Sequence, residues 1–194
     1  MWWARLLNVI SGLLAGGVAA STNSYESIST VTVGAGGVSS VSFSSIPSTF
    51  KHLQIRVMAK SARAAVNDYM QIRINGDTTS ANYRSHALDA DGSGVYAETA
   101  ANDLQVGWLP GNTNASMYGV GVIDLLDYAN TSKNKTIRSL GGFDQNSASA
   151  GTAWIGITSG LWMSTSAITS ITFNSGTSSN LNQYSSFALY GIKG

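Results

Sequence analysis

The sequence has no cysteine, two prolines and two histidines among its 194 residues. Without cysteine, a disulfide-stapled scaffold and a thiolate metal site are both excluded. The two histidines, His52 and His86, are too few for a histidine-rich metal cluster, and each is better explained as a surface or structural residue. We therefore expect no cofactor.

Charge is also scarce: 11% of the residues are charged, and the formal net charge is +1. This composition argues against a basic face that binds nucleic acid, so nucleic acid is not an expected partner. The chain has instead 21 glycines and abundant serine, threonine and asparagine, which is typical of an all-β chain with many tight turns. Its length suffices for one domain with a substantial core.

Two segments with strict alternation of apolar and polar residues organise this β pattern. In residues 53–57 (LQIRV) the polar positions are Gln54 and Arg56, and in residues 70–74 (MQIRI) they are Gln71 and Arg73. Such alternation predicts a strand with one face on a core and one face in water. Arg56 and Arg73 are then candidate contacts with a ligand or a neighbouring subunit, because arginine is enriched at interfaces.

The rest of the chain continues in the same way, with turn signals about every 8–12 residues. We predict about ten strands, at 27–33, 38–43, 53–57, 70–74, 82–89, 117–126, 135–143, 152–163, 167–173 and 184–192. The first two are expected to form a hairpin around Gly34–Gly37, and Trp108–Asn112 is expected to be a turn in the irregular region 95–116. The fold class predicted is an all-β antiparallel sandwich, jelly-roll-like, with a short N-terminal α-helix.

The first twenty residues (MWWARLLNVISGLLAGGVAA) differ from everything after them, and three interpretations compete. They could be a secretory signal peptide, a membrane helix that only just reaches the required length, or an amphipathic assembly helix. The spacing of Trp3, Leu7, Ile10 and Leu14 favours the assembly helix and therefore does not favour a membrane. Its candidate interface residues are Trp2, Trp3, Leu6, Leu7, Ile10, Leu13 and Leu14. The predicted organisation is helix 1–20, linker 21–24 and sandwich domain 25–194.

Motifs for chemistry are weak. Asp89 and Asp91 alternate before Gly92 like half of a calcium loop, but the other ligands of an EF-hand are missing, so a polar turn is preferred and no metal is expected. The two aspartates stay weak candidates for a calcium site of another type, which Asp77 or Glu98 could complete. The neighbours of these two aspartates predict solvent exposure, without a raised pKa. Asp124 and Asp127 do not pair as a glycosidase would need, and no enzyme activity is expected. Trp108 is a candidate ligand contact, for example with a glycan, because it is predicted to lie in a loop.

The domain also resembles a family of small structural proteins of tailed-bacteriophage virions. The residues that carry the resemblance are Ser24–Ile28, Phe43–Pro47, Lys51–Arg56, Ile74–Asp77 and Phe187–Ile192. They span nearly the whole predicted sandwich and are framework residues, so the resemblance implies a fold and a setting, with no active site.

This resemblance implies a non-enzymatic virion protein, an oligomeric tail-fibre or head-fibre type appendage assembled in the bacterial host cytoplasm. Its expected partners are copies of itself in a homotrimer, other virion proteins of the tail, portal or capsid, and a host-surface glycan. Two alternatives stay open: a capsid decoration (cement) protein that stabilises the shell, and a lectin-like secreted or membrane-tethered module. The helix 1–20 would join the subunit to its partners.

Overall fold

A computed structural model describes residues 24–113, 116–147, 149 and 151–194 of the chain. The segment 1–20, with the predicted helix and its seven interface residues, lies outside the described residues. The described part contains β1 (Tyr25–Thr32), β2 (Ser40–Phe43), β3 (His52–Ala59), β4 (Asn67–Ile74), a 3₁₀ turn (Ser80–Asn82), β5 (Tyr83–Ala90), β6 (Val95–Ala101), β7 (Gln105–Pro110), β8 (Gly119–Leu126), β9 (Lys135–Phe143), β10 (Trp154–Trp162), β11 (Ile171–Ser175) and β12 (Ser186–Ile192).

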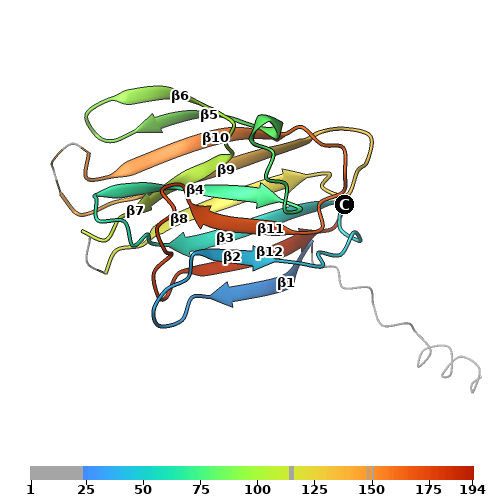
Figure 1. The fold of residues 1–194 in the computed structure, drawn as a ribbon, viewed down its shortest axis with the longest axis horizontal. Helices are drawn as coiled ribbons and strands as arrows, with labels where there is room; N and C mark the ends of the chain where they lie inside the picture. The colour runs from blue at the N-terminus through green and yellow to red at the C-terminus, as the bar shows by residue number, and fades with distance from the viewer. Residues whose placement is uncertain (1–23, 114–115, 148, 150) are drawn as a thin grey trace, which may run out of the picture.

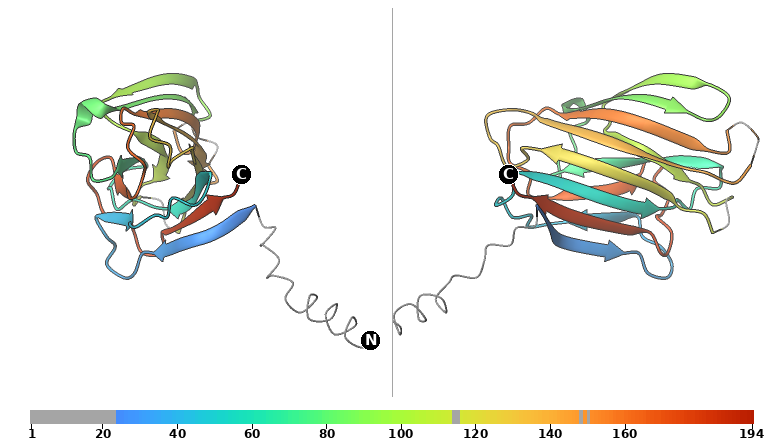
Figure 2. Two further views of the ribbon diagram at one scale, coloured as in Figure 1. Left: turned by 90° about the vertical axis from the view of Figure 1, so that its right-hand side faces the viewer. Right: turned by 180° about the vertical axis from the view of Figure 1, so that it is seen from behind.

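The strands form two antiparallel sheets that pack face to face (Figure 1). The large sheet has eight strands in the order β1-β12-β3-β8-β9-β10-β5-β6, and the small sheet has four in the order β2-β11-β4-β7. The view from behind shows the face of the large sheet that the small sheet does not cover (Figure 2). The prediction of an all-β antiparallel sandwich is confirmed.

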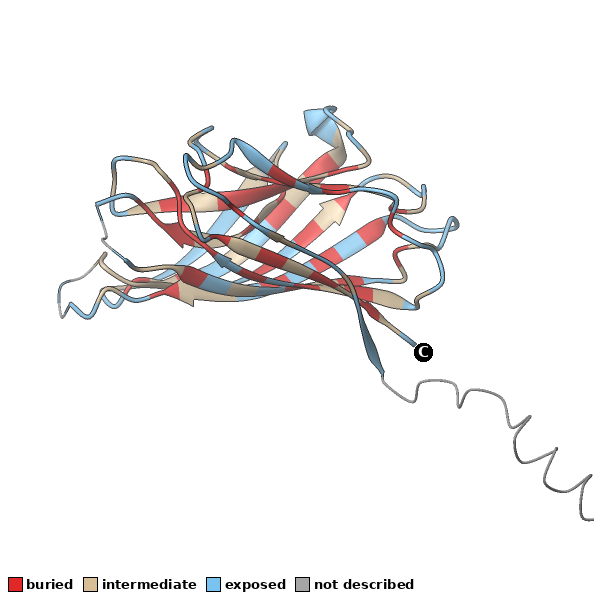
Figure 3. Ribbon diagram, turned by 90° about the horizontal axis from the view of Figure 1, so that it is seen from below, coloured by how far each residue is buried: buried red, intermediate tan, exposed pale blue. Residues whose placement is uncertain are grey.

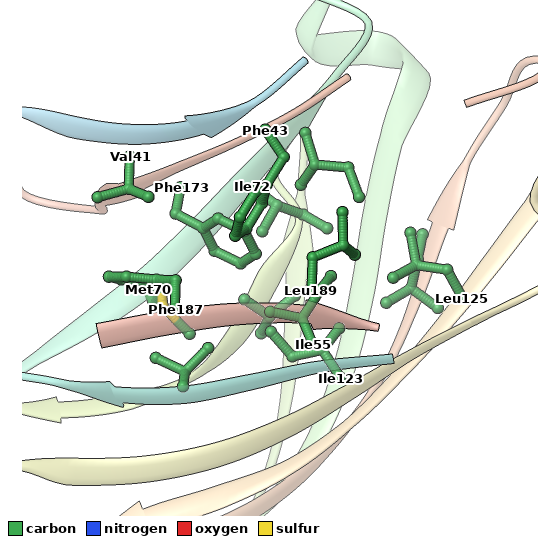
Figure 4. Packing of buried hydrophobic residues seen from close by; sticks show 14 of the residues in the cluster. Val41, Phe43, Ile55, Met70, Ile72, Ile123, Leu125, Phe173, Phe187 and Leu189 are labelled. Atoms are coloured by element: carbon green, nitrogen blue, oxygen red, sulfur yellow. The ribbon is translucent and has the colours of Figure 1, made fainter. Parts of the chain in front are cut away.

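The core lies between the two sheets and is made by the inward positions of the alternating strands (Figure 4). Ile55 of β3 and Ile72 of β4 are both fully buried and belong to opposite sheets. Phe173 of β11 packs against Phe187 of β12 with ring centroids 5.1 Å apart, which joins the small sheet to the large one. The two alternating segments that organise the sequence therefore belong to different sheets.

Two local predictions are wrong. The first two strands do not form a hairpin, because β1 pairs with β12 in the large sheet and β2 pairs with β11 in the small one. The glycine-rich segment Gly34–Gly37 instead carries the chain from one sheet to the other. The region 95–116 is more regular than predicted: it contains β6 and β7, so the described chain has twelve strands where the sequence predicts about ten.

A buried carboxylate joins the loops that follow β3 and β11 to the end of the small sheet. The side chain of Asp68 accepts hydrogen bonds from the hydroxyls of Ser61 at 2.5 Å, Ser175 at 2.5 Å and Thr177 at 2.9 Å. It also accepts the backbone N–H of Tyr69 at 2.8 Å. Since a buried charge is tolerated only when its hydrogen bonds are made, this cluster has a structural role.

Candidate functional site

The outer face of the large sheet, which the small sheet leaves uncovered, is the most unusual surface of the described chain. Buried and exposed residues alternate along its strands (Figure 3), as expected for a sheet with one wet face. Over β8, β9 and β10, however, the exposed positions are large and apolar: Val120 is 61% exposed, Leu140 52% and Ile155 60%. Contiguous apolar surface of this kind marks an interaction site in soluble proteins.

The strand register places these side chains in two adjacent rows that cross the sheet. One row runs from Met58 through Val120 and Ile155 to Val95, and the other runs from Val122 through Leu140 and Ile157 to Leu88. Directly opposite residues of antiparallel strands point to the same side, so the two rows form one surface. We call these eight residues the apolar band: Met58, Leu88, Val95, Val120, Val122, Leu140, Ile155 and Ile157.

A hollow of about 950 Å³ opens in the apolar band where β8, β9 and β10 lie side by side. Val120, Val122, Leu140 and Ile155 form its walls, together with Trp154 at the start of β10. Ligand pockets typically have volumes of about 300–1,000 Å³ and a mainly apolar lining. The hollow lies near the upper end of this range and is also lined mainly by apolar groups.

The floor of the hollow consists of three glycines, Gly121 of β8 and Gly141 and Gly142 of β9. A methyl group on Gly141 would come within 2.6 Å of the backbone oxygen of Val120, and one on Gly142 within 2.1 Å of that of Trp154. The backbones approach too closely here for any side chain. Gly141 and Gly142 therefore allow the close packing of β9 against its neighbouring strands.

The charges at the rim of the hollow lie on opposite sides. Asp91, in the β5–β6 turn, and Asp144, directly after β9, form an acidic side. Arg56 of β3 is at the other side, where its guanidinium lies 5.4 Å from the ring centroid of Tyr190 and its Nε donates to Gln54 Oε1 at 3.4 Å. The positive charge is therefore directed toward β12, away from the acidic side.

Beyond the apolar band, the same face carries a polar row. Gln54, Asp124, Arg138, Ser159 and His86 lie opposite one another on successive strands. The side-chain amide of Gln54 donates to Asp124 Oδ1 at 2.9 Å. The outer face thus carries the apolar band and, beside it, a polar row.

The structure places the two candidate arginines on different sheets, so they form no common site. Arg56 lies on the outer face of the large sheet, at the rim of the hollow. Arg73, on β4 of the small sheet, has its Nη1 3.4 Å from Asp103 Oδ1 and its guanidinium 4.8 Å from the ring centroid of Tyr83. Its positive charge therefore already interacts with Asp103 and with the ring of Tyr83 within the chain.

Trp108 does not lie in a loop, and this prediction is wrong. It belongs to β7, where its ring stacks on that of Trp154 with centroids 4.4 Å apart and meets that of Tyr69 edge-on. The sequence after it, Leu-Pro-Gly-Asn, has the composition of a turn, but Pro110 is the last residue of an edge strand. An edge strand tolerates proline because one side of its backbone needs no partner strand.

The prediction that Asp89 is exposed to solvent is also wrong. Its side chain is only 3% exposed, on the inner face of β5, and its Oδ2 has no hydrogen-bond partner among the described residues. Burial raises the pKa of Asp89 above its ordinary value of 3.8, although Trp108 donates a hydrogen bond to the carboxylate. The cause missed by the sequence pattern is Gly156 on the neighbouring strand, whose missing side chain leaves the space that Asp89 occupies.

Asp91 lies in the predicted polar turn, but it is only 8% exposed, so the prediction of solvent exposure is wrong for this residue as well. Its Oδ1 accepts hydrogen bonds from the backbone N–H groups of Ser93 at 2.9 Å and Gly94 at 3.0 Å, and from the Ser93 hydroxyl at 2.7 Å. The Ser93 hydroxyl is the largest influence that lowers the pKa of Asp91, so this carboxylate is ionised at neutral pH. No group of three or more His, Cys, Asp or Glu side chains that could hold a metal ion occurs within the part of the chain that the structure describes.

Two of the aspartates with shifted pKa values, Asp89 and Asp77, are expected to affect stability in opposite directions as the pH changes. The raised pKa of Asp89 makes the unfolded chain ionise first, so folding loses stability as pH rises above about 3.8. Asp89→Asn should therefore have a higher urea midpoint than the wild type at pH 7, and the difference should disappear below that pH. An equal or lower midpoint at pH 7 would refute this account of the buried carboxylate.

Asp77 provides the control. Trp162 Nε1 donates to its Oδ2 at 2.7 Å, and this bond, followed by that from Asn82, lowers the pKa of Asp77 to about 2. The stability that this carboxylate contributes is present above its ordinary pKa of 3.8 and is lost as pH falls through about 2. Asp77→Asn should therefore lower the urea midpoint at pH 7 and have little effect at pH 2.

The apolar band is the feature that sequence analysis missed. Segments such as Val120–Ile123 and Trp154–Ile157 combine apolar residues with glycine, and the sequence predicts them as parts of strands without indicating which face is covered. The signal that could have found the band is the excess of apolar residues at both alternating positions of three consecutive strands.

Among the described residues, no helix has the length and apolar character needed to cross a membrane.

Comparisons with known proteins assign no family. No protein-family model matches the chain, and no curated protein matches it. Among solved structures it is similar to the galectin LEC-6 of Caenorhabditis elegans, at 7% identity and a TM-score of 0.32, over 86% of this chain and 99% of that one. It is also similar to a fructofuranosidase of Schwanniomyces occidentalis, at 7% identity and a TM-score of 0.18, over 83% of this chain and 35% of the other. Similarities this distant support no functional assignment.

Proposed function

We propose that the chain is a non-enzymatic structural protein of a tailed-bacteriophage virion, an oligomeric tail-fibre or fibre-like appendage. In this proposal residues 1–20 join the subunit to its partners, and the sandwich domain contacts neighbouring virion proteins through the outer face of the large sheet. The observation that carries the proposal is the apolar band, because a subunit that stays alone in water would leave these eight side chains exposed.

The framework residues that resemble the virion family support this setting. Asn75 has a positive φ of 52° and its side-chain oxygen accepts the backbone N–H groups of Thr169 at 2.8 Å and Ser170 at 3.1 Å. Gly191 lies under the ring of Phe50, which leaves no room for a side chain. Residues in these roles maintain a fold, as the resemblance implies.

Two further functions are distinguished by what they would contact. A capsid decoration protein would bury the band and the sandwich edges against the shell. A lectin-like module would use the polar row, where Asp124 and Arg138 lie opposite each other beside Gln54. Charged and amide groups on an exposed sheet are suited to hydrogen-bond a host-surface glycan, and this row is the specific observation that favours glycan contact as a second candidate.

The test is to purify particles of the virus that encodes the chain on a density gradient and to quantify its peptides by mass spectrometry. We expect peptides of the sandwich domain in intact particles at a few copies for each tail or portal. A copy number close to that of the major capsid subunit would replace the appendage by a decoration protein. Absence from particles, with recovery in the host envelope, would contradict both and favour the lectin-like module.

A further inference from the structure

The hollow is an apolar surface of the described chain, and the first twenty residues are an apolar stretch of its sequence. The segment 1–20 contains a single charged residue, Arg5, and no acidic residue. The hollow has apolar walls and an acidic rim of Asp91 and Asp144. The two surfaces therefore match in polarity and in charge.

The chain is long enough to bring the two together. Tyr25, at the start of β1, lies in line with Ile192, His52 and Leu126 across β12, β3 and β8. From Tyr25, the hollow lies about four strand spacings away across the sheet and about five residues away along the strands. Strand geometry therefore gives a separation of about 25 Å between Tyr25 and the hollow. Residues 15–24 can span about 33 Å when extended, so a segment that ends at Leu14 is within reach of the hollow of its own subunit.

The predicted periodicity of the segment also suits the band. Trp3, Leu7, Ile10 and Leu14 share one side of the predicted helix, whereas Arg5 lies off that side. A long cationic side chain beside an apolar seam can extend to the edge of the surface that the seam covers. If the apolar side of the predicted helix lies on the apolar band, Arg5 would meet the acidic rim of the hollow. The guanidinium of Arg56, held over Tyr190, would remain at the opposite side.

We propose that the hollow receives the N-terminal segment of a copy of this chain, with residues 2–14 lying along the apolar band and Arg5 at the rim formed by Asp91 and Asp144. The proposal rests on the proposed function in that residues 1–20 are kept on the mature protein and join subunits. It names the surface to which they bind. A segment bound in this way covers apolar groups on both sides at once, which is the largest gain available to either surface.

The absence of cysteine makes a disulfide test direct. We would oxidise the full-length double variant Leu7→Cys/Leu140→Cys and compare it with Leu7→Cys/Thr136→Cys on a non-reducing gel. Thr136 is a matched control because it is exposed on the same face of the same strand and lies nearer to the row of Tyr25. Circular dichroism melting of the reduced variants would establish that both are folded.

The proposal predicts that Leu7→Cys/Leu140→Cys forms its disulfide about tenfold faster than the control, because a bound segment holds the two thiols at high effective concentration. A linked species with the mass of several chains supports the proposal together with the oligomeric appendage. A linked species with the mass of one chain supports the binding site but contradicts joining of subunits by this segment.

Two results would overturn the proposal. Equal rates for the two variants would show that the segment does not bind in the hollow. Rapid disulfide formation by the single variant Leu140→Cys would show that two sandwiches meet face to face at the hollow, with no room for the segment. In either case the chain could still be found in purified particles, so failure of this inference is distinct from failure of the proposed function.

Discussion

Replacing Gly142 by alanine is expected to lower the free energy of unfolding by about 3 kcal/mol, in the range found when a group is forced into packed structure. The added methyl group would lie 2.1 Å from the backbone oxygen of Trp154 and 2.9 Å from the Cα atom of Ile155. Both are backbone atoms of β10, so no side-chain rotation can relieve the contact, and β9 has to move away from β10. Urea denaturation followed by tryptophan fluorescence measures the loss.

Gly121→Ala is the matched control, because Gly121 also belongs to the floor of the hollow. A methyl group there would lie 3.7 Å from the backbone oxygen of Leu140, an ordinary contact. Its effect should stay within about 1 kcal/mol, since alanine at a compatible position restricts the unfolded chain. A similar loss for the two variants would show that close approach of β9 and β10 is not what requires glycine at position 142.

The sequence predicted the class of fold because that information is local. Alternation in segments such as Leu53–Val57 gives strands directly, and β9 (Lys135–Phe143) was predicted with its bounds. Pairing is not local: nothing near Tyr25–Thr32 indicates that its partner is β12, more than 150 residues away. The hairpin prediction at Gly34–Gly37 failed for this reason.

The site was less predictable than the fold. The acidic turn at Asp91 and the exposed position of Arg56 followed from local pattern. The hollow did not, because it requires Gly121, Gly141 and Gly142 to meet on adjacent strands and the small sheet to leave this face uncovered. The burial of Asp89 depends in the same way on Gly156, a residue of another strand.

The second large effect is expected from a charge in the apolar band. Leu140 is 52% exposed and lines the hollow, so Leu140→Glu should leave the isolated domain folded. If this surface is buried between copies of the chain, the same change places an unpaired carboxylate in the interface. That costs several kcal/mol, so we expect the dissociation constant of the oligomer to rise about a hundredfold or more.

The most direct test of the outer face as the contact surface is the mass in solution, by sedimentation equilibrium, of the full-length wild type, Leu140→Glu and Thr136→Glu. Thr136 is exposed on the same face of β9 but lies outside the apolar band, so its variant controls for added charge. The proposal predicts an oligomer, a trimer in its simplest form, for the wild type and Thr136→Glu, and a monomer for Leu140→Glu. Equal masses for all three proteins would contradict it.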